Sequence, residues 1–114
     1  MTKYYLTLAD GRKVRAEWDM NAMYDFTILT GKDLSDLAMA KSDLGLLRTI
    51  AYCAIKEGEA IDGREFDITE IELGRLIGVK ELVAFLEILS EMTDVEQKKS
   101  EPPKKLLKIF TRGR

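Results

Sequence analysis

The spacing of apolar residues changes once along this chain, at about residue 19, from every second residue to the spacing of a helix face. Before that point, apolar and polar residues alternate over 4–8 and 14–18, on either side of an Asp10-Gly11 pair. Alternation on both sides of Asp-Gly predicts a β-hairpin over 3–18. Because an isolated hairpin is only marginally stable in water, its apolar face must pack on the helices that follow.

The first predicted helix covers 22–30. The side chain of Asp19 or Asn21 can accept hydrogen bonds from its first turn, and Gly31 suits the left-handed conformation that ends a helix. A short polar helical connector is expected over 33–40. The side chains of the first helix expected to face inward, or nearly so, are Met23, Tyr24, Phe26 and Ile28.

A long helix is predicted over 42–56, with Ser42 as its N-cap and Gly58 as its end. Cys53 lies within this helix, where a buried thiol is favoured over a reactive one. The apolar stripe at helical spacing consists of Leu44, Leu47, Ile50, Ala51, Ala54 and Ile55.

The clearest local signal is a capping box, in which Thr69 is the N-cap and Glu72 the third helical residue. The helix that begins there is expected to end near Ile77, before Gly78. A further helix is predicted over 80–92, with one buried face made of Leu82, Phe85, Leu86, Leu89 and Met92.

These elements predict a mainly helical α+β fold, with the N-terminal hairpin packed on a compact bundle of about four helices. A chain of 114 residues, 46% hydrophobic and 33% charged, suits one soluble domain. We expect that domain to cover 1–93, with its helices within 20–92. The open edge of the hairpin suggests a homo-oligomer formed by pairing with a second copy.

Charge is distributed unevenly along the chain. Residues 1–97 hold 11 basic and 19 acidic side chains, whereas residues 98–114 hold seven basic side chains and Glu101. Pro102 and Pro103 mark the junction, because proline cannot donate a backbone hydrogen bond to a continuing helix. We therefore expect a basic, mobile C-terminal tail over 94–114, attached to an acidic body.

Composition removes several classes of chemistry. The chain has no histidine and one cysteine, which excludes Ser-His-Asp and Cys-His catalysis, histidine-bound metals and an internal disulfide. No phosphate-binding loop or calcium loop is present, so no catalytic, cofactor or metal site is expected. The N-terminus lacks a secretory signal and no stretch is long and apolar enough to span a membrane, so we expect a cytoplasmic protein.

Residues 71–92 imitate a helix-turn-helix, with Gly74 and Gly78 suitably placed. The second helix carries Glu81 and Glu87 where phosphate contacts require basic residues, so nucleic acid is not the expected partner. A small DNA-associated regulator, aided by the basic tail, is kept as the alternative function.

The chain resembles the small tail assembly chaperones of long-tailed phages and prophages over about residues 5–92. The resemblance is carried by the hairpin with Asp10-Gly11-Arg12, by Met20-Asn21-Ala22 opening a helix with Phe26, and by Leu29-Thr30-Gly31-Lys32 closing it. The helix over 44–58 and the capped helix at Ile68-Thr69 follow in the same order.

The resemblance implies a non-catalytic protein that holds the hydrophobic tape measure protein until tail tube subunits polymerise around it. Its partners would be the tape measure protein and the tail tube protein. An apolar helix surface and the apolar, cationic tail are the expected binding elements. The predicted partner-binding residues are Phe85, Leu89, Met92, Lys104, Lys105, Leu106, Leu107 and Phe110.

Overall fold

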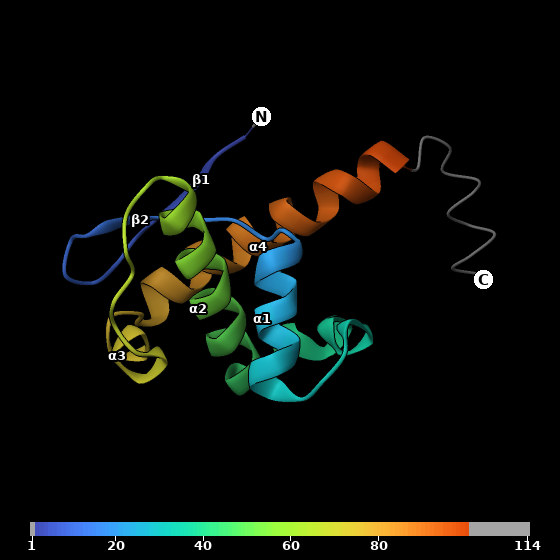
Figure 1. Ribbon diagram of the computed structural model, residues 1–114, viewed down its shortest axis with the longest axis horizontal. Helices are drawn as coiled ribbons and strands as arrows, with labels where there is room; N and C mark the ends of the chain where they lie inside the picture. The colour runs from blue at the N-terminus through green and yellow to red at the C-terminus, as the bar shows by residue number, and fades with distance from the viewer. Residues whose placement is uncertain (1, 101–114) are drawn as a thin grey trace.

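Hairpin and helices follow one another in the predicted order in the computed structural model, which describes residues 2–100 (Figure 1). The side chains at 38, 39, 41 and 94–100 lie outside that description. The elements are β1 (Tyr4–Thr7), β2 (Lys13–Ala16), α1 (Met20–Thr30), the 3₁₀ segment η1 (Leu34–Ser42), α2 (Leu44–Ile61), α3 (Glu70–Arg75) and α4 (Val79–Ser100). The mainly helical fold with an N-terminal hairpin is therefore confirmed.

The two strands pair antiparallel, with Leu6 opposite Val14. Gly11 has a φ of 90°, the left-handed conformation that the Asp-Gly turn requires. The apolar side chains that alternate along the hairpin are buried: Leu6, Leu8, Val14 and Ala16. The period-two prediction is confirmed, and the hairpin contributes one wall of the core.

Helix α1 begins and ends at predicted signals. The Asp19 side chain accepts a hydrogen bond from the Ala22 amide at 3.1 Å, and Gly31 adopts a φ of 72°. Phe26 is buried, but Tyr24 and Ile28 are 63% and 62% exposed, so the prediction that they face inward is wrong. Ala22 and Phe26 share the face that packs on α2, and residues two positions away lie on the opposite side.

Helix α2 differs from its prediction at both ends. Its N-cap is Asp43, not Ser42, and the Asp43 side chain accepts from the Leu46 amide. The helix continues through Gly58 to Ile61 rather than ending near Lys56. Gly58 is buried inside the helix because α2 crosses β2 there. Position 58 therefore requires glycine because of this contact with β2, and not because the helix ends there.

Hydrogen bonds to α2 cover the outer edge of β2. The Arg15 amide donates to Oε2 of Glu59 at 2.9 Å, and the Glu17 amide donates to the Ala54 carbonyl at 2.9 Å. The corresponding edge of the first strand is bonded just past β1, where the Ala9 amide donates to the Leu76 carbonyl at 2.8 Å. Within Tyr4–Thr7 itself, no backbone hydrogen bond to an element other than β2 is found among residues 2–100. Any pairing with a second copy through the hairpin would therefore use β1, and that interface stays a prediction.

A network of ion pairs adds to this contact between β2 and α2. The Arg15 guanidinium donates to Asp62 at 2.7 Å and to Glu17 at 3.2 Å, while Arg64 donates to Glu59 at 2.8 Å. The bonds from Arg64, followed by the Arg15 amide, hold the pKa of Glu59 below its ordinary value in spite of burial. The network fixes the hairpin against the C-terminal end of α2.

The capping box at α3 is confirmed. The Thr69 hydroxyl accepts from the Glu72 amide at 3.1 Å, and the Glu72 carboxylate accepts from the Thr69 amide at 2.8 Å. The helix is shorter than predicted, because it ends at Arg75 rather than near Ile77.

Helix α4 is longer than predicted and runs to Ser100, past the domain boundary expected at residue 93. Its first half packs against β1 and passes behind α2, while its last turns extend away from the other helices (Figure 1). Phe85 and Leu89 are buried in the core. The predicted tail residues 101–114 lie outside the described part of the chain.

Candidate partner-binding site

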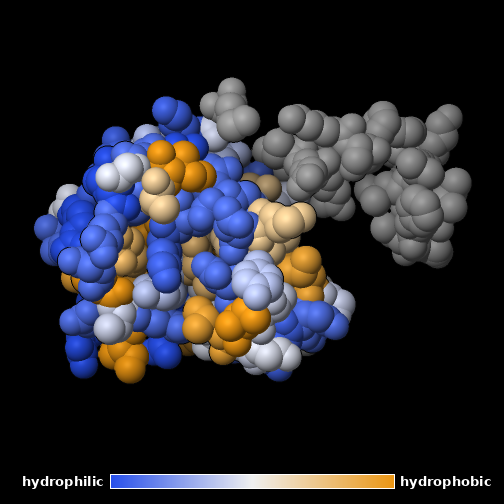
Figure 2. All heavy atoms as spheres, viewed as in Figure 1, coloured by the Kyte–Doolittle hydropathy of each residue, from blue (hydrophilic) through white to orange (hydrophobic). Residues whose placement is uncertain are grey.

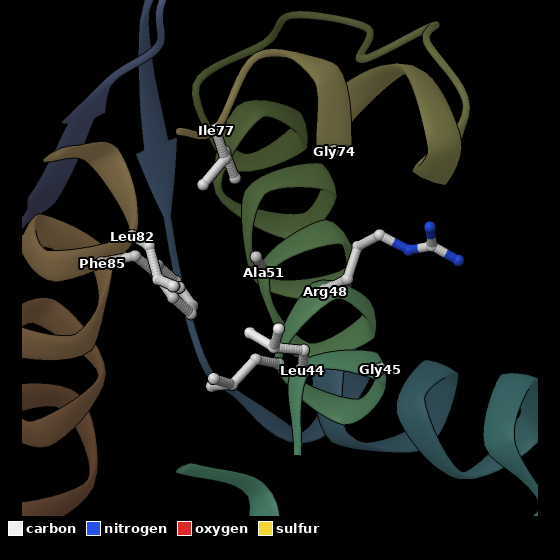
Figure 3. Close-up of a pocket in the computed structure, with 9 residues that line it drawn as sticks. Leu44, Gly45, Arg48, Ala51, Gly74, Ile77, Leu82 and Phe85 are labelled. Carbon is white, nitrogen blue, oxygen red and sulfur yellow. The ribbon is translucent and has the colours of Figure 1, made fainter. Parts of the chain in front are cut away.

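An apolar pocket of about 350 Å³ lies between α2, α3 and α4 (Figure 3). Helix α2 forms one wall, Leu82 and Phe85 of α4 form the opposite wall, and the end of α3 closes one side. The lining residues are Leu44, Gly45, Leu47, Arg48, Ala51, Gly74, Ile77, Leu82 and Phe85.

Small residues leave this space open. Ala51 lies at the back of the pocket, and Gly45 and Gly74 lie at its rim (Figure 3). A Cβ atom at Gly74 would approach Cδ of Arg48 to 3.3 Å. Larger side chains at these positions would fill the volume that separates the helices. The pocket therefore exists because residues this small meet where the three helices come together.

The only charged side chain of the lining residues is Arg48. Its Nε donates to Glu70 at 3.0 Å, and the same carboxylate oxygen accepts from the Thr49 hydroxyl at 2.8 Å. These bonds hold the Arg48 side chain along the rim, where it is half-exposed. Apart from this rim, the lining is largely apolar, which suits an apolar side chain better than a polar ligand.

The pocket contains only part of the site predicted from sequence. Phe85 forms one wall, but it is 1% exposed, so a partner would touch only the ring surface that faces the cavity. Leu89 is buried in the core and Met92 packs half-buried at its edge. The predicted tail residues Lys104, Lys105, Leu106, Leu107 and Phe110 lie outside the described residues.

Sequence reasoning missed the α2 side of the pocket. Leu44 was assigned to the buried stripe, yet it is 68% exposed at the rim. Arg48 and Ile77 had no signal in the sequence, because their role depends on α3 turning back across α2. Gly74 was the one available hint of close helix approach, because a Cβ atom there would meet the Arg48 side chain of α2 at 3.3 Å.

A second hydrophobic surface lies on α1. Tyr24, Ile28 and Leu29 are more than half exposed there, and a depression of about 210 Å³ separates α1 from α2. Figure 2 shows hydrophobic patches separated by hydrophilic residues on the face that carries these two helices. Asp25 and Lys56 line the depression, so it has two charged side chains where the pocket at Ala51 has one.

Charge on α4 bears on the DNA-binding alternative. The helix that would enter a DNA groove exposes Val83, Glu87 and Glu91. Carboxylates on that face would repel phosphates.

Among residues 2–100, no group of three or more candidate metal-ligating side chains is found. None of the helices in that range is both long enough and apolar enough to cross a membrane.

Comparison with known proteins returns no match: no family model, no curated protein and no solved structure is significantly similar to the chain.

Proposed function

We propose that this chain is a non-catalytic protein-binding module that holds an apolar helical segment of a partner in the pocket between α2, α3 and α4. The observation that carries the proposal is an open, apolar volume of about 350 Å³ with an exposed leucine, Leu44, at its rim. Helices are bound in this way when their apolar side chains, spaced three and four residues apart, enter a hydrophobic groove.

The chemistry of the pocket favours a protein over a small molecule. Small-molecule sites combine apolar walls with several placed polar groups, whereas Arg48 is the one charged group here and is already bonded to Glu70. The resemblance to tail assembly chaperones supplies the partner: the tape measure protein, held until tail tube subunits assemble around it. In that role the module would act in the cytoplasm of a bacterial host.

The test begins with the genes on either side of this one. If a long tape measure gene lies next to it, its product is co-expressed with the full chain and retention is measured by pull-down and titration. Leu44→Glu places a charge at the pocket rim and should weaken binding about tenfold, which corresponds to about 1.4 kcal/mol.

Ile61→Glu is the matched control. Ile61 is an exposed apolar residue on the same helix, 49% exposed, and it does not line the pocket. Equal effects of the two substitutions would contradict the assignment of the pocket.

Salt dependence separates this proposal from the DNA-associated alternative. Binding by apolar burial should persist when salt rises from about 50 to about 200 mM, whereas binding through several phosphate contacts falls by orders of magnitude. If the full chain retains a DNA duplex at the lower salt concentration and releases it at the higher one, the DNA-associated alternative is favoured.

A further inference from the structure

Helix α4 carries a second, separate groove on its solvent side. Five residues line this open groove of about 470 Å³: Val83, Leu86, Glu87, Ser90 and Glu91. Their spacing places them on one face of the helix, opposite the buried Phe85 and Leu89. Val83 is 53% exposed, so the groove has apolar side chains in contact with water and carboxylates along its edge.

The charge of α4 restricts what can cover this groove. Over Val79–Ser100 the helix sequence has five acidic and three basic residues, but Lys98 and Lys99 lie at its C-terminal end, seven or more residues beyond the groove. A second copy of α4 would bring like charges together, which opposes pairing of two such faces. The groove therefore fits a segment that is both apolar and cationic.

The sequence beyond α4 has both properties. Residues 101–114 hold five basic side chains against Glu101, and four large apolar residues lie among them: Leu106, Leu107, Ile109 and Phe110. The acidic face of α4 and this segment are opposite in charge and both carry apolar side chains in need of cover.

The connection is long enough for the segment to return. Proline cannot continue the helix at 102 and 103, so the chain can reverse there. Leu86 lies fourteen residues before Ser100, about 21 Å along an α-helix. Ten residues separate Ser100 from Phe110 and span up to about 33 Å when extended.

We propose that residues 104–112 dock back along α4 of the same chain and cover this groove. The apolar residues of this segment then face Val83 and Leu86, and its basic residues face Glu87 and Glu91. The short connection at 101–103 favours the intramolecular contact, because a tethered segment has an effective concentration in the millimolar range. The contact uses a different face from the pocket at Ala51 and does not depend on the proposed function.

The test is the amide NMR spectrum of the full chain without any partner. Steady-state heteronuclear NOE values report order on the picosecond to nanosecond timescale. We expect values for 104–112 close to those of α4, and their loss in Glu87→Lys with Glu91→Lys. The matched control, Glu65→Lys with Asp67→Lys, makes the same charge change at exposed positions outside the groove and should leave the tail ordered.

A second variant controls for the possibility that the substitutions in α4 disturb the helix itself. Leu106→Ser with Phe110→Ser leaves the described helices untouched and should shift the amide resonances of Val83 and Leu86. Mobile tail amides in the unchanged chain, or no response to either variant, would overturn the proposal. So would a dimer in sedimentation equilibrium that the Leu106→Ser, Phe110→Ser variant dissociates, since the tail would then cover a second copy.

Discussion

A Cβ atom on Gly58 would lie 2.2 Å from the carbonyl oxygen of Arg15, so α2 and β2 meet backbone to backbone at this point. The contact permits the hydrogen bonds on either side of it, from the Arg15 amide to Glu59 and from the Glu17 amide to Ala54. Any side chain at position 58 would separate the hairpin from the helix.

Gly58→Ala should therefore destabilise the protein, although alanine is the better helix former. A gain of about 1 kcal/mol in helix propensity is outweighed by overlap with backbone atoms that cannot rotate away. We expect a net loss of about 2 kcal/mol in the free energy of unfolding, measured by urea denaturation. Gly45→Ala in the same helix is the control, because its Cβ would meet only the Asp43 side chain at 3.4 Å. Equal stability of the two variants would refute the close contact.

The free energy of unfolding should fall as the pH drops below about 5, in part through Glu59. Bonds from Arg64 and the Arg15 amide hold the pKa of Glu59 below its ordinary value of 4.5, so the unfolded chain takes up a proton first. The stabilisation from Glu59 is present above pH 4.5, and it is lost as the pH falls through the lower pKa that Glu59 has in the folded protein. Glu59→Gln should cost about 2 kcal/mol at pH 7 and flatten this dependence. Glu65→Gln, at an exposed site, should preserve the wild-type curve.

Cys53 should not react with a thiol reagent in the folded protein. Burial, followed by the charges of Asp25 and Glu70, raises the pKa of its thiol to about 12. Thiolate is the reactive form, and its population near pH 8 is about one part in ten thousand. Colorimetric titration should show no labelling in buffer and one thiol per chain in urea. Rapid labelling in buffer would mean that α1 and α2 open readily at Cys53.

Thr69→Ala should lower the free energy of unfolding by about 1 kcal/mol, because the Glu72 amide loses its capping hydroxyl. Thr69→Ser retains that hydroxyl and should stay close to wild type. Urea denaturation gives the stability, and hydrogen exchange of the α3 amides should show the loss locally. Unchanged exchange in the alanine variant would show that the neighbouring contacts, not the cap, hold α3.

Local sequence determined where several elements begin and how the hairpin forms. Thr69 and Glu72 cap α3, Asp19 caps α1 and Gly31 ends it, as the residues predict. The alternating apolar residues on both sides of Asp10-Gly11 form the hairpin. The caps act between residues at most four positions apart and the hairpin pairs residues at most twelve apart, so each signal can be identified without knowledge of the fold.

Only the tertiary structure decided where α2 and α3 end and which faces are buried. Gly58 looked like the end of a helix, yet contact with Arg15 places it inside one. Tyr24 looked like a core residue, yet its side chain is 63% exposed. The pocket joins residues from α2, α3 and α4 that are distant in sequence. Burial and cavities depend on what packs against a face, and local spacing carries no information about that partner.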